Sequence, residues 1–391
     1  MISPLSGVKV VAMEQAVAMP FCSFILAELG AEVIKIERPG LGDVIRGWDT
    51  AVRGLSAGFV AVNSGKRDLA VDLSRPEGRE IVRELASRAD VFLENFAPGV
   101  ADRLGLGEAD LRPSNSGLVY VSLSGYGHTG PYRDVKAYDL LIQGESGVLL
   151  TNGTEEEPAK VGLPLTDLIG GSTAAIGVLA ALLERERGGG GARLDISMLE
   201  ATVSWLVYFP QRFWHAGEEP PRTGTHHQYL SPYGPYLAAD GHYVNVAVAS
   251  DEDWRRFCEM VVERPAWYAD ERFASAEARN QNRDRLQQVL EPIVAAQPSA
   301  VWIKRLSDAA LAHGAVRTIA EVLSHPQLLN ARTFVEAASP VGDLPVVRFP
   351  LGSPDRARRI PALGEDTVSV LTEVGYSAER IRQLHQAGVV I

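Results

Sequence analysis

The chain is poor in cysteine, in positive charge and in long apolar runs. Its two cysteines among 391 residues cannot form a disulfide framework and are typical of a reducing compartment. The 38 Lys and Arg against 49 Asp and Glu give a net charge of −11, which argues against binding to nucleic acid. The most apolar stretch, 168–183, is shorter than the ~20 residues of a membrane span, and the N-terminus lacks the pattern of a signal peptide. We expect a cytoplasmic protein that binds neither nucleic acid nor membrane.

The common cofactor motifs are missing as well. The turn Glu14–Pro20 after the first predicted strand has no glycine, so the pyrophosphate of NAD or FAD could not approach its backbone closely. Gly65-Lys66-Arg67 does not complete a P-loop, and there is no H-E-x-x-H, C-x-x-C or nucleophile elbow. The side chains of the neighbouring His226 and His227 diverge, so we predict no metal site. The glycine-free turn predicts that no nicotinamide cofactor binds.

The first two hundred residues alternate between strand-like and helix-like patterns. Such alternation predicts an α/β fold with a mainly parallel sheet covered by helices. The predicted strands are 8–13, 31–37, 69–73, 90–94, 117–122 and 192–197, and the predicted helices are 20–29, 77–87, 100–111, 139–148, 167–186 and 199–213.

The pattern changes after this region. Residues 217–236 are rich in Gly, Pro, His and Tyr and are too long for a routine connection, which indicates a functional loop or a domain crossing. Helices dominate from there to about residue 329, and a final helix begins at Ser377. We therefore predict a large domain over 1–215, a small domain with crossing loops over 216–328, and a return to the large domain over 329–391.

Charged and polar residues lie at the ends of several predicted strands: 35–38 closes the second strand, 64–67 precedes the third, 94–96 closes the fourth, and Arg103 follows. Ligands of open α/β sheets collect at the carboxyl ends of strands, so these cations would suit a ligand with several phosphates. They could equally be solvated surface charges. Asp167, at the start of an apolar helix, is either the N-cap of that helix or a carboxylate nucleophile beside glycines that admit a substrate. Asp139 carries the same two alternatives.

Short motifs recur along the whole chain in a definite order. They are Pro4–Val10, Leu29–Gly40 with Gly42-Asp43, Lys66-Arg67 before Val71-Asp72-Leu73, Glu94–Gly99, Ser124–Gly127, Asp195–Met198 and Leu363–Thr367. In this order they resemble class III CoA-transferases, the family of formyl-CoA transferase and carnitine CoA-transferase, with alpha-methylacyl-CoA racemase as a divergent relative.

The resemblance implies a Rossmann-like large domain made from both chain ends, a smaller α+β domain, and an interlocked ring-like homodimer. It places the nucleophilic aspartate at Asp167 and implies that coenzyme A is the co-substrate, with a carboxylic acid as the second small molecule. The implied CoA contacts are Gln15, Ala16, Val17, Ala18, Arg38, Val71, Asn95, Phe96, Arg103 and Lys136, and the implied acyl-site residues are Trp48, Tyr138 and Asp139.

The implied activity is transfer of CoA from an acyl-CoA to a carboxylic acid through an aspartyl-CoA thioester. Val17 replaces a glutamine that serves formyl-CoA transferase, which argues against formyl or oxalyl substrates. Racemisation at the α-carbon is the first alternative, although Tyr138 stands where the racemases have a histidine, and a phenol is a poor base at neutral pH. A non-catalytic acyl-CoA-binding protein is the second. Arg46, Arg222 and His226 either bind a second substrate carboxylate or are surface residues.

Overall fold

The structure is a computed structural model that describes residues 3–391 in two compact units. The first unit contains the described residues up to Ser146, Val161–Val207 and Pro326–Ile391, and the second contains Gly147–Lys160 and Tyr208–His325. The sequence had placed 147–160 in the large domain. The structure groups this segment with the second unit, where Arg222 Nε donates to the carbonyl of Thr154 at 2.7 Å.

The first unit is built on a parallel sheet of six strands in the order β3-β2-β1-β4-β5-β6, as the βαβ alternation predicts. The strands are β1 (Lys9–Met13), β2 (Glu32–Glu37), β3 (Arg67–Ala70), β4 (Val91–Glu94), β5 (Val119–Ser124) and β6 (Arg193–Ser197). The order along the sheet reverses between β1 and β4. Ligands of open α/β sheets bind at such a reversal, outside the carboxyl ends of the strands.

Alternate residues of these strands feed two cores, one on each face of the sheet. Val10 and Ala12 of β1 pack with α1 and α8, whereas Val11 and Met13 pack with α3 and α18. The helices of this unit are α1 (Ala18–Glu28), α2 (Ala57–Asn63), α3 (Pro76–Ala86), α4 (Val100–Arg103), α5 (Glu108–Leu111), α6 (Asp139–Glu145), α8 (Leu165–Glu186), α9 (Met198–Ser204), α16 (Pro326–Asn330), α17 (Thr367–Glu373) and α18 (Ala378–Gln386), with a 3₁₀ turn over Val44–Gly47.

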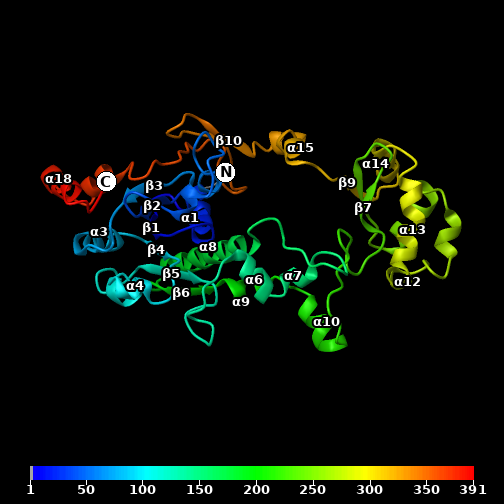
Figure 1. Cartoon of the computed structure of the whole chain (residues 1–391), viewed down its shortest axis with the longest axis horizontal. Coiled ribbons are helices and arrows are strands. Elements are labelled where there is room, and N and C mark those ends of the chain that lie inside the picture. The colour runs from blue at the N-terminus through cyan, green and yellow to red at the C-terminus, as the bar shows by residue number, and fades with distance from the viewer. Residues whose placement is uncertain (1–2) are drawn as a thin grey trace. The chain divides into compact units, whose positions relative to one another are not determined.

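The C-terminal segment closes the first unit. It forms a hairpin of β10 (Phe334–Ala337) and β11 (Leu344–Val347), and its last helix, α18, lies beside α3 (Figure 1). The guanidinium of Arg358 binds the carboxylate of Glu28 on α1 at 2.7 and 2.9 Å, and both side chains are buried. This pair joins the segment to the helix that follows β1.

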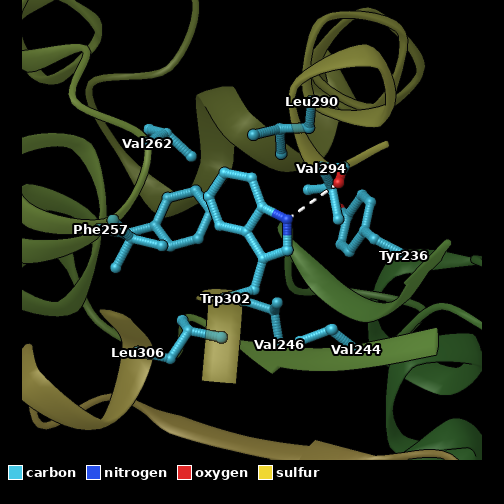
Figure 2. Close-up of a pocket in the computed structure, with 10 residues that line it drawn as sticks. Tyr236, Val244, Val246, Phe257, Val262, Leu290, Val294, Trp302 and Leu306 are labelled. Atoms are coloured by element: carbon cyan, nitrogen blue, oxygen red, sulfur yellow. Dashed lines mark hydrogen bonds between the residues drawn. The ribbon is translucent and has the colours of Figure 1, made fainter. Parts of the chain in front are cut away.

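The second unit has an antiparallel sheet of β7 (Tyr233–Leu237), β8 (Tyr243–Ala247) and β9 (Ala312–Ala315), covered by helices. Trp302 fills its core, and the indole N–H donates to the carbonyl of Val294 at 2.9 Å (Figure 2). Its helical segments are α7 (Val148–Thr151), α10 (Phe209–Ala216), α11 (Asp251–Arg256), a π turn (Phe257–Val261), a 3₁₀ turn (Pro265–Ala269), α12 (Ala276–Gln281), α13 (Arg283–Val294), α14 (Ser299–Asp308) and α15 (Ile319–Leu323).

Three predicted helices are wrong in extent. Residues 199–213 form parts of α9 and α10, separated at Val207, whose φ of +52° cannot continue a helix. Gly147, with φ +83°, separates α6 from α7, and the stretch 100–111 is split between α4 and α5. Helix α8 is long and apolar enough to cross a membrane, but half of its apolar window is buried inside the fold, where it packs against α1. This burial is typical of a core helix.

Candidate active site

Two neighbouring cavities open in the first unit where the strand order reverses. The larger has a volume of about 540 Å³ and the smaller about 270 Å³, and Gln15 and Phe96 line both. Gln15 follows β1 and Phe96 follows β4, so both cavities lie at the carboxyl edge of the sheet. The two cavities therefore lie side by side and share these two lining residues.

Asp167 lines the larger cavity from the first turn of α8. It is not the N-cap, because that position belongs to Pro164 and no side chain caps the helix from there. The helix start is held instead by Asp139, whose Oδ1 accepts hydrogen bonds from the N–H of Thr166 at 2.8 Å and from its hydroxyl at 2.9 Å. The carboxylate of Asp167 therefore faces the cavity without a capping role.

The carboxylate of Asp167 has no hydrogen-bond or ion-pair partner anywhere in residues 3–391. Burial, together with the nearby negative charge of Asp139, raises the pKa of this carboxyl from 3.8 to about 7. A desolvated carboxylate without hydrogen-bond donors is a stronger nucleophile than a solvated one. Its place at the helix N-terminus, where the dipole favours negative charge, still permits ionisation near neutral pH.

The glycines after Asp167 serve helix packing. A Cβ on Gly171 would lie 2.3 Å from the main-chain oxygen of Ala18, so only glycine lets α8 approach the start of α1 this closely. Residues four apart share one face of a helix, and Asp167 is therefore held beside the turn that precedes α1. This packing role applies to Gly171, whereas a Cβ on Gly170 would lie 3.2 Å from Met198 and 3.4 Å from Leu123, which both line the larger cavity.

The predicted CoA contacts divide between the two cavities, with one exception. The larger cavity is lined by Gln15, Ala16, Ala18, Asn95, Phe96, Arg103 and Lys136, and the smaller by Gln15, Arg38, Val71 and Phe96. Val17 lines neither, because its side chain is buried in an apolar cluster with Ile45 and Phe59. Arg103 and Lys136 find no acceptor within the described chain, so both cations are free to bind an anion.

Two of the three predicted acyl-site residues, Trp48 and Tyr138, line the larger cavity and are largely exposed. Asp139 does not line it. Besides its bonds to Thr166, the carboxylate of Asp139 accepts a hydrogen bond from Nε2 of Gln143 at 2.8 Å. Asp139 therefore acts on the site in two ways: it binds the start of α8, and its negative charge raises the pKa of Asp167.

Of the three suggested receptors for a second substrate carboxylate, Arg46 and Arg222 are occupied, whereas the buried Nε2 of His226 has no hydrogen-bond partner within residues 3–391. Arg46 binds Glu37 at 2.8 Å and Asp68 at 3.4 Å and lies over the ring of Phe59, so its guanidinium is fully used. Arg222 donates to main-chain carbonyls of the second unit, and His226 also belongs to that unit.

Sequence reasoning missed several cavity residues. Arg133 and Met198 line the larger cavity, and Asp43 lines the smaller. Asp43 and Met198 belong to the motifs that carry the family resemblance, but the sequence assigned neither of them a function. Nothing in the sequence around Arg133 indicates that it turns back toward the sheet edge.

The position of Phe96 depends on a buried acid. Its N–H donates to Oε2 of Glu94 at 2.9 Å, and the hydroxyl of Ser122 donates to the other oxygen of Glu94. Burial raises the pKa of Glu94 to about 7, so a second carboxyl near the site titrates close to neutral pH. No group of three His, Cys, Asp or Glu within residues 3–391 is placed to hold a metal ion.

Comparisons with known proteins identify the family of the chain. A family model described as CoA-transferase family III matches residues 5–367. Human succinyl-CoA:glutarate CoA-transferase is 32% identical over 100% of this chain and 90% of its own length, and acetyl-CoA:oxalate CoA-transferase of Acetobacter aceti is 36% identical over 83% of each. The crystal structure of a CAIB/BAIF family protein from Brucella suis superposes with a TM-score of 0.84 at 32% identity, covering 96% of this chain and all of that one.

Proposed function

This chain belongs to CoA-transferase family III and transfers CoA between an acyl-CoA and a carboxylic acid, and we propose that it does so through a covalent aspartyl-CoA thioester on Asp167. The observation that carries the proposal is the half-buried carboxylate of Asp167, which lines a cavity of about 540 Å³ and accepts no hydrogen bond from residues 3–391. A structural carboxylate would be paired.

The proposed reaction needs only this carboxylate and the bound substrates. Asp167 attacks the thioester carbon of the acyl-CoA, which breaks the C–S bond and gives a mixed anhydride and the CoA thiolate. The thiolate attacks the aspartyl carbonyl, forming the aspartyl-CoA thioester and releasing the donor acid as its carboxylate. An acceptor carboxylate then attacks the aspartyl carbonyl, which breaks the C–S bond and gives a second mixed anhydride and the CoA thiolate. The thiolate attacks the acyl carbon of the acceptor, which gives the new acyl-CoA and releases Asp167 as its carboxylate. Activated acyl bonds are exchanged throughout, so the reaction requires no ATP.

The two cavities suggest how the long CoA molecule binds. We propose that its adenosine end occupies the smaller cavity, near Arg38 and Val71. The pantetheine arm passes Gln15 and Phe96, which line both cavities, to reach Asp167 in the larger one. Arg103 and Lys136, which line the larger cavity, are exposed and meet no acceptor within residues 3–391, so they suit an anionic group of the bound substrates. The first N–H groups of α1, which no helical carbonyl can reach, suit the oxyanion that develops during attack.

A panel of acyl-CoA donors and free acids, read by mass spectrometry, tests this function. Two relatives are named for succinyl-CoA with glutarate and for acetyl-CoA with oxalate, so the panel begins with these pairs. We expect a new acyl-CoA to appear for at least one pair without ATP. Deuterium exchange at the substrate α-carbon without CoA exchange would favour racemisation, and CoA binding without any turnover would favour a non-catalytic protein.

The pH dependence of the reaction follows from the raised pKa of Asp167. With a pKa of about 7, the carboxyl of Asp167 is mostly protonated below pH 7, and only the ionised form attacks the thioester. We expect kcat/KM to rise with pH through about 7 and then level off, as measured with saturating acceptor. Because the charge of Asp139 is the second cause of the shift, Asp139→Asn should move this limb to lower pH.

Glu94 also has a pKa of about 7, so its variant is the control for this assignment. The charge of Glu94 is not among the causes that raise the pKa of Asp167. Glu94→Gln should therefore leave the position of the limb unchanged, although its rate falls if Phe96 moves. A limb that shifts in Glu94→Gln and stays in Asp139→Asn would contradict the assignment to Asp167.

We further propose a cytoplasmic homodimer. In the first unit, large apolar side chains remain in solvent on α8 and after α9: Ile176 is 67% exposed, Trp205 57% and Val207 71%. Such side chains favour burial against a second copy. Light scattering coupled to gel filtration is expected to give twice the chain mass, about 84 kDa from 42.2 kDa per chain. A monomer at micromolar concentration would contradict the dimer.

A further inference from the structure

The turn between β1 and α1 lies where the two cavities meet. Gln15 lines both cavities and Ala16 lines the larger one. Ala16 has φ +62°, a left-handed conformation that residues other than glycine rarely adopt. A turn of this kind keeps its shape only when its surroundings hold it.

Asn95 holds one side of the turn. Its Oδ1 accepts a hydrogen bond from the N–H of Gln15 at 2.9 Å, and its Nδ2 donates to the carbonyl of Gln15 at 2.9 Å. Asn95 comes directly after β4, so this pair of hydrogen bonds bridges the two strands between which the sheet order reverses. Each end of the Asn95 amide thus binds the main chain of Gln15.

Asp43 holds the other side. Its Oδ1 accepts a hydrogen bond from the N–H of Ala16 at 2.9 Å, and its Oδ2 binds the ammonium of Lys35 at 2.8 Å. Lys35, which is fully buried, also donates to the carbonyl of Glu14 at 3.3 Å. Three successive residues, Glu14, Gln15 and Ala16, are therefore fixed by side chains from β2, from the start of the 3₁₀ turn Val44–Gly47 and from the residue after β4.

We propose that Asn95 and Asp43 are positioning residues, which clasp the Gln15–Ala16 turn so that it presents a fixed surface to the CoA thioester beside Asp167. Neither side chain needs to contact the reacting atoms. The turn contributes to both cavities, so a loosened turn weakens CoA binding and also misplaces the thioester relative to Asp167. Small misplacements of reacting groups reduce rates strongly.

The first test compares Asn95→Ala with Asn115→Ala. Asn115 is a matched control in the same unit, because its Nδ2 also binds main-chain carbonyls, those of Ala86 and Ala89, and it lines neither cavity. In Asn95→Ala we expect the Gln15 and Ala16 amides to exchange hydrogen at least tenfold faster. We also expect at least tenfold weaker CoA binding by calorimetry and at least tenfold lower kcat/KM. In Asn115→Ala all three quantities should stay within about twofold of the original protein.

The second test uses Asp43→Asn. Asp43→Ala would leave the buried ammonium of Lys35 without its nearest carboxylate, so a loss of folding could hide the effect on the turn. Asp43→Asn also removes this charge but keeps one oxygen, which can accept from either the Ala16 N–H or the Lys35 ammonium, so one of the two contacts is lost. We expect faster exchange of the Ala16 amide and a lower kcat/KM, and denaturant unfolding of the same preparation shows whether the whole fold has loosened. Unchanged exchange and unchanged kcat/KM would show that Asp43 does not hold the turn.

The outcomes separate this inference from the proposed function, on which its rate measurement rests. Weaker CoA binding in Asn95→Ala with unchanged amide exchange would mean that Asn95 contacts CoA directly, and would overturn the inference. Faster exchange with unchanged CoA binding and kcat/KM would overturn it as well. If the original protein transferred no CoA at all, the proposed function would fail, while amide exchange and CoA binding would still decide whether the clasp positions the turn.

Discussion

Asp167→Asn is expected to abolish CoA transfer, with a fall in kcat of at least about a thousandfold. The amide has the shape of the carboxylate but cannot form the anhydride, and loss of a covalent nucleophile is among the largest single effects in enzymes. CoA binding should remain within a few-fold, because the carboxylate of Asp167 makes no hydrogen bond or ion pair with the described residues that would shape the cavity. Transfer kinetics and calorimetry on the same preparation measure both quantities.

The same substitution should stabilise the fold. The folded protein holds a proton on Asp167 up to about pH 7, whereas the unfolded chain loses it near 3.8, so stability falls as pH rises through this interval. At pH 8 the amide avoids the buried charge and is expected to raise the unfolding free energy, by at most about 4 kcal/mol for three pKa units. Asp284→Asn, in the first turn of α13, is the control and should change neither stability nor rate appreciably. A destabilised Asp167→Asn would mean that the carboxylate is a structural group.

Gly171→Ala is expected to have the second-largest effect. The new Cβ would lie 2.3 Å from the oxygen of Ala18 and 3.3 Å from the nitrogen of Cys22, both backbone atoms, so α8 and α1 must move apart. Overpacking of this kind costs about 1–3 kcal/mol, which exceeds the gain of about 1 kcal/mol in helix propensity. Because Asp167 lies one turn away, we expect kcat/KM to fall by about ten- to a hundredfold.

Gly177→Ala is the matched control on the same helix. There the Cβ would lie 3.1 Å from the side chain of Leu194, which can shift, so stability should be unchanged or improved and the rate unaffected. Thermal unfolding and steady-state kinetics of the two variants decide the question. Equal rates in Gly171→Ala and Gly177→Ala would show that the close approach of α8 to α1 does not position Asp167.

The strands and their parallel order could be predicted because buried parallel strands are short apolar runs separated by helical patterns. The helix breaks could not, because they depend on single residues such as Val207, whose left-handed backbone has no signature in its side chain. Likewise, the sequence could not separate the N-cap role of Asp167 from a nucleophilic one. The structure excludes the N-cap role, because Pro164 stands at the N-cap and Asp139 binds the helix start.

The roles of the site residues were only partly open to sequence reasoning. Spacing placed Asn95 and Arg103 near a strand end, but it could not indicate that Asn95 binds the main chain of Gln15, eighty residues away. Spacing also could not indicate that Arg46 forms ion pairs with Glu37 and Asp68, since both pairs depend on how β2 and β3 lie beside each other. Long-range pairing of this kind appears only in the folded chain.

The most direct measurement traps the covalent intermediate. The protein is incubated with an acyl-CoA that it accepts, treated with hydroxylamine, digested and analysed by mass spectrometry. We predict a hydroxamate, 15 Da heavier than the acid by the atomic composition of the two groups, on the peptide that carries Asp167, formed only when acyl-CoA is present. A protein that turns over acyl-CoA in the same tube while this residue stays unmodified, or carries the label on another carboxylate, would contradict the account.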